Sequence, residues 1–485
     1  MDAVVKNPLQ LPEIRAQIAR ILEPKDAVAC AQVCRAWTSD FLASIWRVVD
    51  FAVHERFVAL DTETIAKNGH HIRIVKNLKE LAQLEALLSL SVSRVVSLTM
   101  VIQPSLRFRV NSYDLLRQNS ASLEFLDLAA VPDSKNLSVP MDVLHSGSKL
   151  TVLKLQGVCM SRNSFSALLR GCDALVVVQM YKTSLVSRSS SDIYQHPRVD
   201  SLVAPLNQVF HVDDNSPNAQ PLLAHFPSLR TWNTFDYGEL DVSTPVFKEQ
   251  ATKYCPMLKS FYCPSPGPVV AQLVLHGFER LIELKVKYDH LTIDAIVAIL
   301  THHKSIWHLD TFLLQKNILE SSDPNPVKDH LQGSGRIMQL IPRICNELIT
   351  LSFPLHEMDM DEVEKGSWGC KYLMTLHVRV RGLDTKEKIE KAIMLWKTGR
   401  NVRKRKWSDI WGGGSNLDED SDQDVGDPKP DLNPCPSPDL DDDDDDRVEP
   451  VSTLEFNSIE ARVARHLLKF DILESVWLGT EVFTV

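Results

Sequence analysis

The chain has 485 residues, of which 44% are hydrophobic and 24% are charged, and its formal net charge is −10. These fractions are typical of a globular protein and exclude a chain that is disordered throughout. Residues 400–449 hold 7 basic and 16 acidic side chains, so the other residues together carry a net charge of only −1. A globally basic nucleic-acid binder is therefore excluded, because a phosphate backbone needs clustered positive charge.

The sequence predicts an intracellular protein, located in the cytoplasm, the nucleus or both. No apolar run approaches the ~18 residues that a membrane-spanning helix needs, so no membrane partner is expected. The first residues lack the basic start and apolar core of a secretory signal. The nine cysteines are scattered and form no Cys-x-x-Cys pair, which indicates reduced thiols and neither a disulfide framework nor a zinc site.

The first fifty residues predict three short amphipathic helices. Pro12 and Glu13 suit the first turn of the first helix, because proline lacks an N–H that would be unpaired there and the carboxylate complements the helix dipole. Pro24 is expected to break this helix. Asp26 is expected to cap the second helix, whose predicted apolar face is Cys30, Val33, Cys34 and Trp37. The third helix is indicated by apolar residues at Phe41, Leu42, Ile45 and Trp46.

The order and spacing of these residues resemble an F-box over residues 8–50. The residues that carry the resemblance are Leu11-Pro12-Glu13-Ile14, Leu22, Asp26, Val33-Cys34-Arg35-Ala36-Trp37 and Ile45-Trp46-Arg47. The resemblance implies docking onto the Skp-type adaptor of SCF ubiquitin ligases and, through it, onto a cullin scaffold. The side chains that it assigns to adaptor binding are Leu11, Pro12, Ile14, Leu22, Val33, Cys34 and Trp37.

The segment Arg15-Ala16-Gln17 departs from the F-box pattern, where another apolar residue is common. A unit of ~40 residues is also near the lower size limit for independent folding, so it is expected to pack on a partner or on the rest of the chain. The alternative interpretation is therefore that these helices only cap the next domain.

The body of the chain repeats the pattern apolar-x-x-apolar-x-apolar. Successive matches begin 23 to 42 residues apart, and most intervals are near 25, which is the period of leucine-rich repeats. The matches begin at Val95, Leu123, Leu150, Leu175, Val199, Leu229, Leu258, Leu281, Ile306, Leu348 and Leu373, and the pattern returns at Leu473. Helical stretches are expected between the matches, at Ser164–Leu169, Ile293–Leu300 and Ile337–Ile344.

These matches resemble leucine-rich repeats of the kind found in F-box proteins of fungi. The resemblance implies an α/β fold in which an irregular solenoid, a horseshoe with parallel strands on its concave face, follows the F-box. The sequence lacks the Asn or Cys that regular repeats use to bond the turn after the strand, and residues 199–263 fit poorly. The alternative is a non-repetitive α/β domain. The predicted parts are the F-box (8–50), a connecting segment with the start of the solenoid (51–94), the repeats (95–398), an acidic insertion (399–452) and a last repeat with a cap (453–485).

In a strand of this pattern, the residues that flank the middle apolar position face away from the core. The solenoid therefore predicts which side chains line the concave face. The candidates for binding an unknown protein target are Phe125, Val152, Lys154, Val177, Tyr262, Lys285 and His308. The alternative is that an N-terminal segment of the chain covers the apolar members of this set.

The acidic insertion is predicted to be disordered, because it combines low hydrophobicity with a block of six aspartates at 441–446. It follows a predicted helix over Lys386–Lys397 and the basic cluster Arg403, Lys404, Arg405 and Lys406. Such a cluster in a flexible segment is a candidate nuclear-import signal. The alternative is a solvated helix end whose charges pair loosely with the aspartates.

No catalytic, metal or cofactor site is expected from the sequence. Gly333-Ser334-Gly335 lacks the Lys and Ser or Thr of a phosphate loop. His302, His303 and His308 do not have the spacing of a helical zinc motif and are interpreted as a surface turn. The leading hypothesis is thus a non-catalytic substrate-recognition subunit of an SCF-type ubiquitin ligase. The runner-up is a leucine-rich-repeat interaction scaffold with no part in ubiquitination.

Overall fold

The structure is a computed structural model of the whole chain. It describes residues 8–54, 57–58, 60, 62–90, 92–131, 149–186, 193–205, 221–234, 249, 251–263, 278, 280–287, 293–312, 339–411, 457–478 and 481–484. The chain divides into two compact units, residues 1–320 and 321–485. Of the insertion predicted to be disordered, 399–452, residues 399–411 are helical, and residues 412–452 lie outside the described residues.

The first unit begins with a group of three helices, which we call the helical module. After the short helix η1 (Pro8–Gln10) come α1 (Pro12–Ile21), α2 (Pro24–Ala31) and α3 (Arg35–Ile45). The first helix ends at Ile21, before Pro24, as expected, and Pro24 opens α2, since the first helical position tolerates a missing N–H. The predicted second helix was therefore too long: Val33 and Cys34 lie between α2 and α3, and Trp37 belongs to α3.

The rest of the first unit is an open, parallel α/β sheet in which strands alternate with helices or irregular segments. Its strands pair in the order β1-β2-β3-β4-β5-β7-β9-β10-β11-β12-β13, and every pairing is parallel. The strand bounds are β1 Val48–Asp50, β2 Ile74–Leu78, β3 Ser97–Ile102, β4 Phe125–Ala130, β5 Val152–Gln156, β7 Val177–Tyr181, β9 Ser201–Val203, β10 Thr231–Asn233, β11 Ser260–Cys263, β12 Glu283–Lys287 and β13 His308–Phe312.

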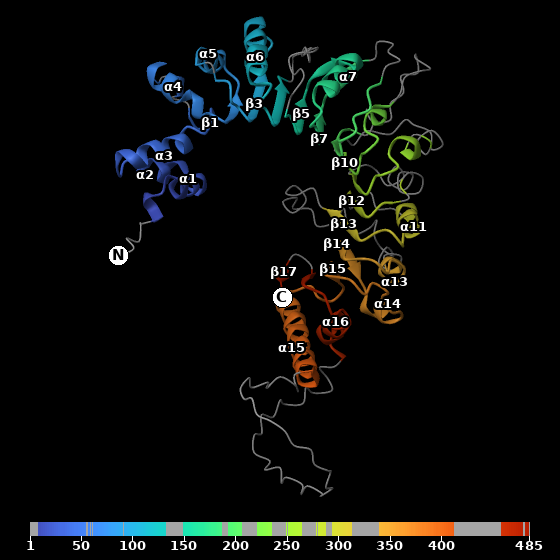
Figure 1. Cartoon of the computed structure of the whole chain (residues 1–485). Helices are drawn as coiled ribbons and strands as arrows, with labels where there is room; N and C mark the ends of the chain where they lie inside the picture. Colours follow the sequence, from blue (N-terminus) through green and yellow to red (C-terminus); the bar gives the residue numbers. More distant parts are fainter. Residues whose placement is uncertain are drawn as a thin grey trace, which may run out of the picture. The chain divides into compact units, whose positions relative to one another are not determined.

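Helices lie on the outer side of the curved first unit and the strands lie on its inner side (Figure 1). The helical elements are α4 Thr62–Asn68, η3 Gly69–His71, α5 Leu81–Ser89, α6 Leu106–Asn119, α7 Arg162–Gly171, η5 Leu222–His225 and α11 Ile293–Thr301. A second, two-stranded sheet is formed by β6 (Cys159–Ser161) and β8 (Ser184–Val186), which the sequence did not predict. This arrangement is solenoid-like, as expected, because each repeat can bury its apolar face only against its neighbours.

The second unit has the same alternation and ends differently. It comprises α13 (Leu340–Ile344), β14 (Thr350–Met358), α14 (Met360–Glu364), β15 (Thr375–Val380), α15 (Lys386–Trp411), α16 (Ile459–Leu467), β16 (Ser475–Leu478) and β17 (Glu481–Thr484). Strands β14, β15 and β16 pair in parallel, whereas β17 pairs antiparallel with β16. The sequence predicted β16 from its repeat pattern but not β17.

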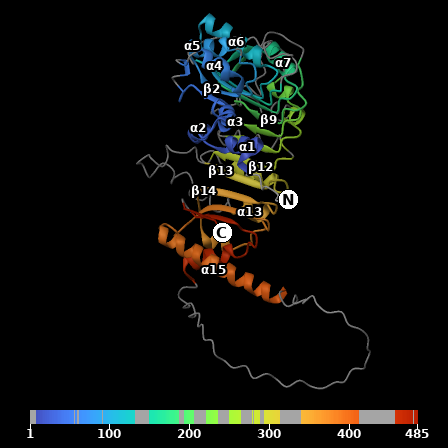
Figure 2. The ribbon, with the colours of Figure 1, turned by 60° about the vertical axis from the view of Figure 1, so that its left-hand side comes forward.

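Helix α15 is much longer than predicted (Figure 2) and packs beside α16 (Figure 1). The prediction ended it at Lys397, but its backbone is helical through the basic cluster to Trp411. Gly399 lies inside the helix, and its missing side chain leaves room for Leu468 at the end of α16. A Cβ at this position would stand 2.7 Å from Cδ1 of Leu468. Arg400 and Arg403 also donate hydrogen bonds to the carbonyls of Leu473 and Leu468, which fixes this part of the helix.

The repeat pattern places the core correctly. In and just before β4, for example, Leu123, Leu126 and Leu128 are fully buried, and buried and half-buried residues alternate in β3, β5 and β7. The poorly matching stretch 199–263 also forms strands, β9 to β11, and they keep the parallel register. These strands are short, with three or four residues each.

The sequence missed the first two strands, although the signal was present. The pattern Trp46-x-x-Val49-x-Phe51 spans β1 (Val48–Asp50). This strand lies inside the range predicted for the F-box, 8–50. Ile72-x-x-Val75 marks β2 in the same way. The third apolar residue of β2 is displaced to Leu78 because the register shifts between Val75 and Leu78, and this irregularity hid the repeat.

Buried polar side chains in the first unit connect successive repeats in place of a regular Asn or Cys. Asn119, at the end of α6, accepts a hydrogen bond from the Val95 N–H (2.9 Å) and donates to the carbonyls of Val92 (2.8 Å) and Leu115 (2.9 Å). Further along, a ring nitrogen of His196 lies 3.0 Å from the Cys172 carbonyl. The sequence did not predict these bridges, because the residue type changes from repeat to repeat.

We expect Asn119→Ala to lower the free energy of unfolding by about 2–4 kcal/mol, since it leaves a buried N–H and a buried carbonyl unpaired. Chemical denaturation of the full chain would measure the change. Ser120→Ala provides a control, because this half-buried hydroxyl donates to the carbonyl of the exposed Arg117 in the same helix. A loss below about 1 kcal/mol for Asn119→Ala would contradict the bridging role.

Candidate functional site

The helical module has a small core of its own. Ala19, Ala27 and Phe41 are buried, and Ile18, Leu22, Cys30, Ala31, Trp37 and Ile45 pack against them. The Trp37 and Phe41 rings are stacked, with centroids 5.6 Å apart and an interplanar angle of 18°. The module is thus held together by two aromatic rings and several small side chains.

A buried ion pair locks α1 to α3 in the module. The Nε of Arg15 lies 2.5 Å from Oδ2 of Asp40, and the Arg15 Nη1 donates to the Leu9 carbonyl at 2.8 Å. The Arg15 side chain is only 8% exposed. The departure from the F-box pattern at Arg15 therefore falls on an internal position of the module, where the arginine joins both helices and η1.

We expect Arg15→Ala to destabilise the module by about 3 kcal/mol, because it leaves the Asp40 carboxylate partly buried and unpaired. Thermal unfolding followed by the near-ultraviolet signal of Trp37 and Trp46 would measure the loss. Arg20→Ala, an exposed arginine on the same helix, is the matched control and should change stability by less than about 0.5 kcal/mol. Equal effects of the two substitutions would contradict this account.

The residues predicted to bind an adaptor divide into two groups. Leu11, Pro12, Val33 and Cys34 are exposed and accessible to a partner. Leu22 and Trp37 pack against the module core, and Ile14 is half-buried. The side chains of the second group therefore stabilise the fold of the module. Substitutions there would affect folding as well as binding.

Several exposed apolar side chains of the module were missed by the sequence reasoning. Together with two predicted residues they form a set of large apolar side chains that are 40% exposed or more: Leu9, Leu11, Ile21, Val28 and Val33. We call this set the apolar surface of the module. Ile21, which is 85% exposed, repeats at helical spacing with Ile14 and Ile18 along α1. Its exposure shows that the apolar spacing of α1 includes a residue that the module does not bury.

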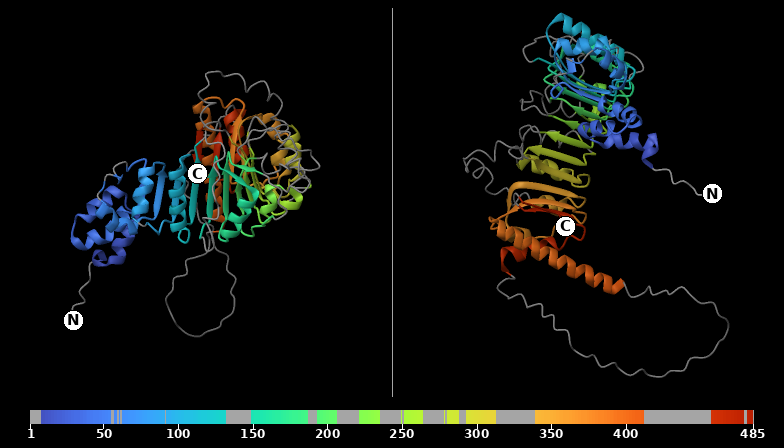
Figure 3. Two further views of the ribbon diagram at one scale, coloured as in Figure 1. Left: turned by 90° about the horizontal axis from the view of Figure 1, so that it is seen from above. Right: turned by 90° about the vertical axis from the view of Figure 1, so that its left-hand side faces the viewer.

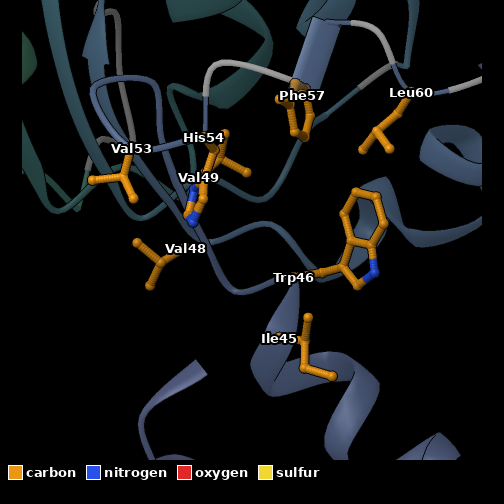
Figure 4. Close-up of a pocket in the computed structure, with 8 residues that line it drawn as sticks. All are labelled: Ile45, Trp46, Val48, Val49, Val53, His54, Phe57 and Leu60. Atoms are coloured by element: carbon orange, nitrogen blue, oxygen red, sulfur yellow. The ribbon is translucent and has the colours of Figure 1, made fainter. Parts of the chain in front are cut away.

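A pocket lies between the end of α3 and β1, with a volume of about 460 Å³. Its lining is almost entirely apolar and is shown in Figure 4: Ile45, Trp46, Val48, Val49, Val53, His54, Phe57 and Leu60. Phe57 contacts Trp46 edge-on at 6.2 Å and Phe51 at 5.5 Å. Aromatic contacts thus connect the module to the first strand, while the pocket leaves part of the junction open.

The strands of the first unit lie side by side (Figure 3), so residues at matching register positions form rows across its inner face. One row, which we call the first row, contains Phe125, Val152 and Val177, continues through Ser201, Thr231 and Ser260, and ends at Glu283 and His308. The row two residues further along contains Asp127, Lys154, Gln179, Val203, Asn233, Tyr262, Lys285 and Asp310. The parallel register thus brings all the candidate target-binding residues onto one face.

The beginning of this face combines apolar and charged groups. Phe125, Val152 and Val177 are half-buried neighbours in the first row. Lys154 lies beside them, 2.8 Å from the Asp127 carboxylate and 5.7 Å from the centre of the Tyr181 ring. The ammonium group is therefore held in place by two partners and can still contact a ligand on the inner face.

A charged cluster occupies the later part of the face. The Glu283 carboxylate lies 2.9 Å from Lys285 and accepts a hydrogen bond from Ser260. Burial tends to raise the pKa of Glu283, but these hydrogen bonds and the charges of Lys285 and His308 outweigh it, and the pKa is lowered. Glu283 is thus ionised at neutral pH, so this part of the face presents fixed charges of both signs.

The remaining candidates are placed as follows. Arg403 is exposed on α15 and lies 3.9 Å from the Asp471 carboxylate, while the side chains of residues 404–406 lie outside the described residues. His302 and His303 lie in the turn after α11 and His308 lies in β13.

In the described ranges, no three His, Cys, Asp or Glu side chains are grouped so that they could hold a metal ion. None of the helices described is both long and apolar enough to cross a membrane.

The comparisons with known proteins add no relative. No protein-family model matches the chain. No curated protein matches it in sequence either.

Proposed function

We propose that this protein is a non-catalytic substrate-recognition subunit of an SCF-type ubiquitin ligase. In this proposal the helical module is an F-box that binds a Skp-type adaptor, and the inner face of the leucine-rich-repeat-like sheet binds a protein target. Ubiquitin transfer would be performed by other subunits, and the contribution of this chain is to raise the effective concentration of the target near them.

The observation that carries the proposal is the apolar surface of the module. Large apolar side chains that a small module leaves exposed are candidates for burial by a partner. Here Leu9, Leu11, Ile21, Val28 and Val33 are exposed on a module of about forty residues whose core is small. A partner that buries these side chains would stabilise both the module and the complex.

The scaffold alternative, in which the module only caps the sheet, is less well supported. A cap would turn its apolar side chains toward the first strand, as Trp46 does toward Phe57. The exposed apolar side chains instead lie on η1, α1 and α2 and at residues that follow η1 and α2. The module therefore exposes apolar side chains other than those that join it to β1.

Co-purification of the full chain with a Skp-type adaptor tests the proposal. The expected result is a stable complex of one chain with one adaptor. A matched chain that lacks residues 1–46 should remain folded in its sheet and fail to bind. If the intact chain fails to bind the adaptor, the ligase proposal is wrong; if the shortened chain binds equally well, the module is not the binding site.

A further inference from the structure

The pocket between the end of α3 and β1, which we call the junction pocket, lies where the described sheet begins (Figure 4). Two of its lining residues, Ile45 and Trp46, stand at the end of α3. Two more, Val48 and Val49, belong to β1, and the other four belong to the segment that follows β1. One short stretch of sequence, 45–60, therefore provides all the described walls of this pocket.

Hydrogen bonds hold these walls in place. The His54 N–H donates to the Asp50 carbonyl at 2.7 Å, which closes the turn after β1. The Asp50 carboxylate accepts a hydrogen bond of 2.7 Å from the side chain of Asn77 in β2. At the start of the same pair of strands, the Arg73 N–H donates to the Arg47 carbonyl at 3.0 Å. β1 and its turn are thus fixed to β2, and the pocket is preformed, as small-molecule sites usually are.

The walls are apolar and aromatic, and the pocket has the size of a small-molecule site. Phe57 and Val49 are only 6% and 3% exposed, so packing fixes both side chains. The Phe57 ring contacts Trp46 and Phe51 edge-on. The volume of about 460 Å³ falls within the roughly 300–1,000 Å³ that is usual for such sites. An apolar molecule that occupied this space would gain dispersion contacts and remove apolar surface from water.

His54 gives the pocket one hydrogen-bond donor of defined position. Its Nδ1 accepts a hydrogen bond from the Asp50 N–H at 3.1 Å. A ring nitrogen that accepts carries no proton, so the ring proton lies on Nε2. Nε2 forms no hydrogen bond with any residue in the described part of the chain. A ligand with an acceptor oxygen would therefore meet a donor that the turn already orients.

The charge near His54 argues against an anionic ligand. The hydrogen bond from Asn77 lowers the pKa of Asp50, although burial opposes the shift. Asp50 therefore carries a negative charge at neutral pH close to the turn of His54, and it would repel a second negative charge there. The lining residues that the structure describes include no lysine or arginine that could compensate.

We propose that the junction pocket binds a neutral small molecule with an apolar body, about the size of a two-ring aromatic compound, and one acceptor oxygen. The apolar body would pack on Trp46, Phe57 and Val49, and the oxygen would accept a hydrogen bond from Nε2 of His54. The pocket shares no lining residue with the apolar surface of the module. The proposal is therefore independent of adaptor binding.

Fluorescence titration of the full chain with prodan, a neutral naphthyl ketone dye, tests this proposal. The wild-type chain should show one saturable site with a blue shift of the dye emission. Val53→Trp should weaken binding at least tenfold, because Val53 is 74% exposed and a larger ring there can fill the pocket without displacing the core. Val110→Trp, at a position on α6 that is 47% exposed and outside the pocket, is the matched control and should bind like the wild type.

Two competitors of the same shape test the role of His54. Acetylnaphthalene carries an acceptor oxygen and ethylnaphthalene does not, so the wild-type chain should prefer the ketone several-fold in displacement of the dye. His54→Phe keeps a ring in the wall and loses the donor, so this preference should disappear while both competitors still bind. A structural role of His54 alone would weaken both competitors equally, and this result would overturn the assigned hydrogen bond.

Three further results would overturn the proposal. The first is the absence of a saturable site on the wild-type chain. The second is unchanged dye binding by Val53→Trp, which would place the dye elsewhere, for example on the apolar surface of the module. The third is displacement of the dye by one equivalent of a Skp-type adaptor, which would show that the pocket belongs to a protein interface.

Discussion

Replacing Leu11 and Val33 together by aspartate should weaken binding of a Skp-type adaptor by about 100-fold or more. Both side chains are exposed, at 43% and 63%, so the substitutions leave the module core untouched. In a complex they would be covered, and each aspartate would place an unpaired carboxylate in an apolar interface. Central interface residues commonly contribute about 2 kcal/mol or more, which is ~30-fold in affinity for each. Titration calorimetry with the purified adaptor measures the effect.

The control for this prediction is Leu106→Asp, which changes a side chain of α6 that is 71% exposed and remote from the module in sequence. It should leave adaptor affinity unchanged. Both variants should unfold within about 2 °C of the wild-type chain. If the double variant retains wild-type affinity, the apolar surface of the module does not bind the adaptor.

The second prediction is a loss of stability in mild acid caused by two buried histidines. His466 on α16 is buried, and neither ring nitrogen has a hydrogen-bond partner among the described residues. Its ring packs edge-on against Trp368 at 4.6 Å. Burial, with a smaller effect of Lys469, lowers the pKa of His466 to about 4. In the first unit, burial lowers the pKa of His225 to about 4 as well, although its hydrogen bond to the Tyr194 carbonyl opposes the shift.

The direction follows from proton linkage. The unfolded chain binds a proton at each histidine below pH ~6.5, whereas the folded chain resists protonation down to about pH 4. Stability is therefore complete above pH 6.5 and is lost as the pH falls toward 4, by up to about 1.4 kcal/mol per pH unit for each histidine. The carboxylates with lowered pKa values, Glu283 and Glu364, lose their contribution only at still lower pH.

Denaturation of the His466→Phe variant at pH 7 and pH 5 measures this effect. Phenylalanine keeps the aromatic contact with Trp368 and removes the titrating group, so at pH 5 the second unit should be about 2 kcal/mol more stable than in the wild type. His303→Gln, at a half-buried turn position, should leave the pH dependence unchanged. If His466→Phe shows the same loss between pH 7 and pH 5 as the wild type, burial of the neutral ring is not its cause.

The periodic parts of the fold were predictable from the sequence. Residues such as Leu123, Leu126 and Leu128 must all face one core, so their spacing determined strand, register and exposed face at once. The pattern failed where geometry breaks the period, as at the register shift before Leu78. It also failed where packing overrides local signals. The predicted helix ended at Lys397, yet α15 continues past Gly399, whose missing side chain leaves room for Leu468.

The candidate sites were predictable only in part. Composition and order indicated the helical module, but not which of its residues remain exposed, because exposure depends on how three helices share a core. Trp37 therefore proved to pack on Phe41, whereas Ile21 is open to solvent. The proximity of Arg47 and Arg73 could not be predicted, since they are far apart in sequence and only the parallel pairing of β1 with β2 makes them neighbours.

Amide hydrogen exchange of the full chain, with and without a Skp-type adaptor, tests the central claim most directly. Binding through the apolar surface of the module should slow exchange in residues 8–34 and leave the strands of the sheet unchanged. Protection confined to the strands, or no protection in residues 8–34 at saturating adaptor, would contradict the assignment of the module as the adaptor-binding site.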